Sequence, residues 1–129
     1  MLKKNLPGIA WFFLVLVLIC LPGDDLPHPE SWMDAVFFDK WIHVGLFGML
    51  AFLFMRPIGI SSSYSIPYKK LFFFKVALAT IVWGITTELI QKFFIPKRSF
   101  DLFDWSADSA GAIIGWVVAR WLYVRRRAV

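Results

Sequence analysis

The chain has 129 residues, which is enough for one domain of ordinary size and too few for two. Hydrophobic residues make up 59% of it and charged residues 18%, whereas soluble proteins hold roughly 45–50% and roughly 25%. Because a small domain leaves much of its surface exposed, a soluble fold could not cover this much apolar surface. The composition therefore excludes an ordinary soluble enzyme, a disordered tail and a disulfide scaffold, and it predicts a membrane protein.

The first apolar run covers residues 5–21, follows Lys3 and Lys4, and stops at Pro22 and Gly23. Such a run can be a cleaved signal peptide or a retained helix. The residues before Pro22 are Val-Leu-Ile-Cys-Leu, which offer no small residues at cleavage spacing. A retained membrane helix is the favoured interpretation, and the lone cysteine within it is expected to be inert.

Three further apolar runs follow, at residues 36–55, 71–95 and 102–124. Each has about the length that a helix needs to cross a bilayer. Helices are expected because an open sheet cannot leave its edges in lipid. The sequence therefore predicts an all-α fold, a single transmembrane domain over residues 1–129 that forms a bundle of four transmembrane helices.

Charge placement predicts the orientation of this bundle in the cytoplasmic membrane of the cell. With the N-terminus inside, ten of the fourteen basic residues lie at cytoplasmic ends, namely Lys3, Lys4, Arg56, Lys69, Lys70, Lys75, Arg120, Arg125, Arg126 and Arg127. This bias places both termini in the cytoplasm. All acids and both histidines then fall on the outer half, at Asp24, Asp25, His28, Glu30, Asp34, Asp39, His43, Glu88, Asp101, Asp104 and Asp108. The net charge of +5 is thus a topology signal, and no nucleic-acid partner is predicted.

Several polar residues lie inside the apolar runs at one membrane level. Asp39 and His43 share one helix face, as do Glu88 and Gln91 on the next helix. Asp101, Asp104 and Asp108 begin the last helix, and Arg98 lies in the loop before it. Ionised groups at this depth are costly unless paired, so these side chains should face one another. Asp101, Asp104 and Asp39 could instead cap or begin helices, Arg98 could be a surface partner of Asp101 or Asp104, and His43 could bond to Asp39 or a backbone carbonyl.

Small residues continue the acidic stripes inward. Gly111 and Gly115 follow Asp108 at helical spacing, and Thr80 and Gly84 precede Glu88 in the same way. Small residues four apart let membrane helices approach closely. We therefore expect the third and fourth predicted helices to pack tightly beneath an outward-facing polar pocket.

The same positions resemble the VanZ-like family of small membrane proteins. The resemblance rests on Asp39-Lys40-x-x-His43-x-x-x-Phe47-x-x-Leu50, on Glu88-x-x-Gln91, on Arg98, and on Asp104, Asp108, Gly111 and Gly115, over roughly residues 36–116. One departure is Asp108, where the family often has Asn, and this adds a potential charge. The resemblance implies a cell-envelope role like the teicoplanin resistance from which the family takes its name, with no settled catalytic mechanism.

Three functions are consistent with these residues. The first is binding of a surface or lipid-linked anionic group by Arg98, Gln91 and Lys40, since arginine suits a phosphate. The second is a hydrolase or transferase acting on a lipid-linked envelope precursor, with catalytic candidates His43, Asp39, Glu88, Asp104 and Asp108. The third is a transporter, which a missing polar path through the inner half disfavours. The oligomeric state is left open. No cofactor is predicted, although His43, Glu88, Asp104 and Asp108 could hold a divalent cation.

Overall fold

The computed structural model describes residues 1–21 and 38–126, and the elements within them are helical. They are α1 (Leu2–Ile19), α3 (Phe38–Ile60), α4 (Ile66–Phe94), α5 (Leu102–Arg120) and a π-helical turn (Trp121–Arg125). The all-α prediction is confirmed. Several residues used for the predicted orientation lie outside the described part of the chain, namely Asp24, Asp25, His28, Glu30, Asp34 and Arg127.

Two helix boundaries differ from the predicted ones for local reasons. α3 does not stop before Pro57 but continues to Ile60, and its last turn is held by Lys69, whose Nζ donates to the Gly59 carbonyl at 2.9 Å. α4 begins before the apolar run, at Ile66, because the Ser65 side chain caps it. The Lys69 side chain is therefore buried, at 2% exposure.

The closest packing in the molecule joins α3 to α5. A Cβ added to Gly111 would lie 2.3 Å from the Val44 carbonyl oxygen, and one added to Gly115 would lie 2.5 Å from that of Gly48. Only glycine allows this approach, so the predicted Gly111–Gly115 seam exists, but it faces α3. The predicted packing of α4 against α5 also exists, but it uses Gly84 and not the Gly111–Gly115 seam.

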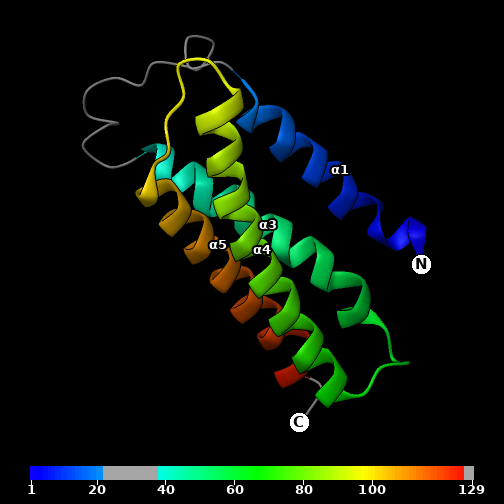
Figure 1. The fold of residues 1–129 in the computed structure, drawn as a ribbon. Helices are drawn as coiled ribbons and strands as arrows, with labels where there is room; N and C mark the ends of the chain where they lie inside the picture. Colours follow the sequence, from blue (N-terminus) through cyan, green and yellow to red (C-terminus); the bar gives the residue numbers. More distant parts are fainter. Residues whose placement is uncertain (22–37, 127–129) are drawn as a thin grey trace.

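α4 packs on α5 through a different glycine, and α1 completes the bundle (Figure 1). Gly84 of α4 faces the Asp108 side chain and Trp105 of α5. Trp105 Nε1 also donates to the Ile81 carbonyl at 3.0 Å. On the other side, Trp11 Nε1 of α1 donates to the Leu46 carbonyl of α3 at 2.9 Å. These bonds satisfy indole groups that lipid could not, and they fix the helices in register.

Three helices are long and apolar enough to cross a membrane, at Leu2–Ile19, Asp39–Ile60 and Ile66–Phe94. α5 runs beside α3 along much of its length (Figure 1) but is not among them, because Asp104 and Asp108 lower its mean hydropathy. Large apolar side chains such as Phe13, Phe74 and Phe103 are exposed on the outside of the bundle. The protein is a helical membrane protein, and a crossing by α5 remains a prediction.

Candidate functional site

The predicted polar residues do meet at one end of the bundle, where α3 and α5 begin. We call this set the polar cluster. It comprises Asp39, Lys40 and His43 of α3, Glu88 of α4, and Asp101, Asp104 and Asp108 at the start of α5. Three elements that are far apart in sequence each contribute acids, as the requirement for mutual pairing predicted.

Lys40 is the centre of the outer half of the cluster. Its Nζ lies 2.5 Å from Asp39 Oδ2, 2.6 Å from Asp104 Oδ1 and 3.0 Å from Asp101 Oδ2. The Asp39 side chain is 59% exposed, whereas those of Lys40 and Asp104 are about 21% and 17% exposed. Lys40 thus neutralises acids from two helices. Sequence reasoning treated it as a headgroup ligand or interface residue and missed this structural role.

His43 is bonded to an acid on the opposite helix. Its Nδ1 lies 2.7 Å from Asp108 Oδ1, and its Nε2 lies 3.7 Å from Asp104 Oδ2, beyond hydrogen-bond distance. Asp39, which was one alternative partner for His43, is instead bonded to Lys40. Among the alternatives, the structure therefore favours Asp108 of α5 as the partner of the imidazole.

Asp101 joins α5 to α4. Its Oδ1 accepts hydrogen bonds from the backbone N–H groups of Phe103 and Asp104, so it is the N-cap of α5, and its own N–H donates to Glu88 Oε2 at 3.0 Å. Burial alone would raise the pKa of Asp101. The hydrogen bonds from Lys40 and Phe103 outweigh burial and hold the pKa of Asp101 below its ordinary value.

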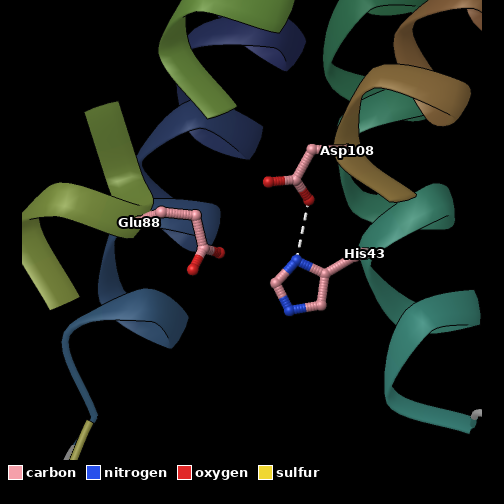
Figure 2. A group of neighbouring side chains, drawn as sticks. All are labelled: His43, Glu88 and Asp108. Carbon is pink, nitrogen blue, oxygen red and sulfur yellow. Dashed lines mark hydrogen bonds and ion pairs between the residues drawn. The ribbon is translucent and has the colours of Figure 1, made fainter. Parts of the chain in front are cut away.

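Glu88 and Asp108 form the buried floor of the cluster, both at 0% exposure. Glu88 Oε1 and Asp108 Oδ2 have no hydrogen-bond partner among the described residues. One ligand atom each from His43, Glu88 and Asp108 lie within 4.8 Å of one another. In Figure 2 the Asp108 oxygen that is not bonded to His43 points towards the side on which Glu88 lies. The imidazole lies beside both carboxylates. Two buried carboxylates thus meet beside one imidazole.

The remaining predicted residues, Gln91 and Arg98, have no ion pair or hydrogen bond with the cluster among the described residues. Gln91 is buried and its Nε2 donates to the Ile19 carbonyl at the end of α1, at 3.3 Å. Arg98 is half-buried in the loop between α4 and α5, and its guanidinium has no ion pair with another residue of the described segments. The acids expected to orient Arg98 are occupied by Lys40 instead.

An apolar groove runs beside the cluster between α3 and α5. Its lining residues are Val44, Gly45, Gly48, Met49 and Phe52 of α3 with Ile114, Gly115 and Val118 of α5. Gly48 and Gly115 line this groove where α5 packs against the backbone of α3. A Cβ added to Gly45 would meet nothing within 4 Å, so the groove is open at its polar end.

Comparison with known proteins gives a family match. A family model described as VanZ/LLP1 matches residues 8–123, a range that includes the whole polar cluster. No curated protein and no solved structure matches the chain.

Proposed function

The chain belongs to the VanZ/LLP1 family, and we propose that it binds a lipid-linked anionic group of the cell envelope beside the polar cluster. In this proposal the protein lies in the cytoplasmic membrane, with both termini inside and the cluster facing outward. Figure 1 supports it, since the start of α1 and the end of α5 lie away from the end at which α3 and α5 begin. Described basic residues at the ends opposite the cluster are Lys3, Lys4, Arg56, Lys69, Lys70, Arg120, Arg125 and Arg126.

The observation that carries the proposal is the different pairing of Lys40 and Arg98. Three carboxylates already hold Lys40, whereas Arg98 has no ion pair among the described residues. Arg98 precedes Asp101 by three residues, so its backbone lies within about 10 Å of the cluster rim. A planar guanidinium without an acid partner suits a phosphate through two parallel hydrogen bonds.

The apolar groove supplies a place for the lipid tail. It begins next to His43 on α3, and its lining is almost entirely apolar, from Val44 to Phe52 and from Ile114 to Val118. A lipid chain laid along α3 and α5 would put its phosphate at the polar end of the bundle. Headgroup and tail would then be bound by adjacent parts of one surface.

The direct test is binding of a polyprenyl phosphate to the full chain in nanodiscs, followed by native mass spectrometry. Arg98→Lys should weaken binding by roughly 10- to 150-fold, because a lost charge-assisted hydrogen bond costs about 1.5–3 kcal/mol. Lys92→Gln is the control, since Lys92 is an exposed cation near the end of α4 that stacks on Phe93. Equal binding by wild type and Arg98→Lys would reject the guanidinium role.

A resistance role like that in the family's name follows from the same site. A protein that holds a lipid-linked envelope component could change how a glycopeptide reaches its target at the cell surface. Cells that express the wild-type chain should then tolerate more teicoplanin than cells that express Arg98→Lys. If cells with wild type and cells with Arg98→Lys tolerate teicoplanin equally at equal protein levels, the binding activity is not the cause of resistance.

A second function, hydrolysis or group transfer on a lipid-linked precursor, is favoured by the His43–Asp108 pair. When the Nδ1–H of His43 donates its hydrogen bond to Asp108, Nε2 carries no proton. Its lone pair is then available, as a general base requires. Release of inorganic phosphate from a polyprenyl diphosphate by wild type, and its loss in His43→Gln, would support this function. If folded wild type releases no inorganic phosphate, this second function is rejected and only binding remains.

A further inference from the structure

The floor of the polar cluster has more negative charge than its own residues neutralise. Lys40 contacts Asp39, Asp101 and Asp104 and makes no contact of this kind with Asp108 or Glu88. These two fully buried acids are left with one imidazole and one backbone N–H between them. Burying carboxylates without a matching cation is strongly unfavourable.

Two buried oxygens mark where the missing partner would lie. Glu88 Oε1 and Asp108 Oδ2 accept no hydrogen bond within the described residues, although both side chains are at 0% exposure. Both belong to the group of three side chains in Figure 2. Unpartnered buried oxygens are rare in folded proteins, and an ion is one standard reason for them.

The dimensions and the donor types fit a metal ion. Donor atoms of His43, Glu88 and Asp108 lie within 4.8 Å of one another, and tetrahedral bonds of about 2.0–2.2 Å to an ion would draw these donors to roughly 3.3–3.6 Å apart. One imidazole nitrogen with carboxylate oxygens suits Zn²⁺ or Mn²⁺, whereas Mg²⁺ and Ca²⁺ prefer oxygen alone.

We propose that His43, Glu88 and Asp108 bind one divalent cation of the Zn²⁺ or Mn²⁺ type at the floor of the polar cluster. The ion replaces a proton on the imidazole and bridges α3, α4 and α5. It uses the two free carboxylate oxygens and leaves the contacts of Lys40 with the outer acids in place. Asp104, which the sequence had suggested as a further ligand, is outside this set because it is bonded to Lys40.

What the ion does for the ligand rests on the proposed function. An anionic headgroup at Arg98 would otherwise meet a cluster with five carboxylates and only Lys40 and His43 to offset them. The divalent ion enters as the imidazole proton leaves, so the floor gains one net positive charge, which reduces this repulsion. The binding of the metal itself can be measured without any lipid, so a failure of the lipid proposal leaves it standing.

The test is equilibrium dialysis of the purified full chain in detergent against Zn²⁺ or Mn²⁺, with metal measured by mass spectrometry. We expect one ion per chain in wild type and at least tenfold weaker binding in Glu88→Gln and Asp108→Asn. Asp39→Asn is the matched control, because it removes an acid from the same cluster that is exposed and bonded to Lys40. It should bind like wild type.

The opposite results would overturn the site. The site is rejected if folded wild type shows no saturable metal binding. It is also rejected if Asp39→Asn loses as much metal binding as the floor variants, because the metal would then lie on the outer acids. If the floor variants do not fold, pulsed electron paramagnetic resonance of Mn²⁺ bound to wild type shows whether His43 is a ligand. Coupling to an imidazole nitrogen is expected, and a bound Mn²⁺ without it would reject His43 as a ligand.

Discussion

His43 Nδ1 on α3 lies 2.7 Å from Asp108 Oδ1 on α5, so the two helices are joined by a polar pair as well as by their glycine seam. The pair comes one residue before Val44 and three before Gly111, the two residues whose backbones lie closest across the seam. Any change that separates α3 from α5 should therefore disturb the polar cluster too. The fold and the site depend on the same contact.

Gly111→Ala tests this dependence. The new Cβ would lie 2.3 Å from the Val44 carbonyl oxygen, which is backbone and cannot move aside. We expect a loss of stability of about 1–3 kcal/mol or more, seen as a lower Tm in detergent. Gly45→Ala is the control, because its Cβ would meet nothing within 4 Å. Equal melting of both variants would contradict the observed α3–α5 packing.

Removal of the Lys40 charge should destabilise the fold. Lys40→Gln leaves acids of two helices facing one another without a cation. The expected cost is about 1–3 kcal/mol, between the values for exposed and buried ion pairs. Lys92→Gln, at an exposed position, should cost less than about 0.5 kcal/mol.

A double variant distinguishes charge from packing in this prediction. Adding Asp104→Asn to Lys40→Gln removes one of the acids that lost its partner. Part of the lost Tm should return if unbalanced charge is the cause. No recovery would mean that Lys40 acts through the packing of its hydrocarbon chain.

Asp101 should make stability depend on pH. Its pKa is lower in the folded protein, so its ionised form stabilises the fold above the unfolded pKa of about 3.9, and this contribution is lost as pH falls through the folded pKa. Asp101→Asn keeps a good N-cap but removes the charge. Its Tm should therefore be lower than that of wild type near neutral pH, with a difference that shrinks below about pH 4. A difference that stays constant with pH would assign the effect to the cap.

The single cysteine reports the orientation. Cys20 is exposed and comes directly after α1, whose last carbonyl, that of Ile19, accepts from Gln91 near the cluster end of α4. If both termini are cytoplasmic, a membrane-impermeant thiol reagent should label Cys20 in intact cells, with Cys20→Ser as the blank. Labelling of Cys20 only after the membrane is opened would contradict this orientation and indicate the opposite one.

Much of the fold could be predicted from the sequence, because apolar runs and acids inside them follow from the cost of polar groups in lipid. The same argument predicted that Asp39, His43, Glu88 and Asp108 would gather at one end. The pairings could not be predicted, since they depend on the rotation of each helix about its axis. For this reason Asp108 rather than Asp39 is the partner of His43, and Gly111 faces α3 rather than α4.

Lys40 shows the same limit for a single residue. Its neighbours in the sequence indicate an interface lysine, and nothing in them reveals that Asp101 and Asp104 of α5 lie within 3.0 Å of its Nζ. Arg98 was expected to take this place. The structure leaves its guanidinium without an ion pair in the described segments, which is consistent with the ligand contact predicted for Arg98 and argues against its alternative role as a partner of Asp101 or Asp104.

Photocrosslinking of a polyprenyl phosphate analogue to the full chain in nanodiscs tests the central claim most directly. With the reactive group beside the phosphate, we expect crosslinks in the loop at residues 95–101 and in the first turns of α3. Crosslinks confined to the other end of the bundle, near Tyr64 and Tyr68, would contradict the proposed site.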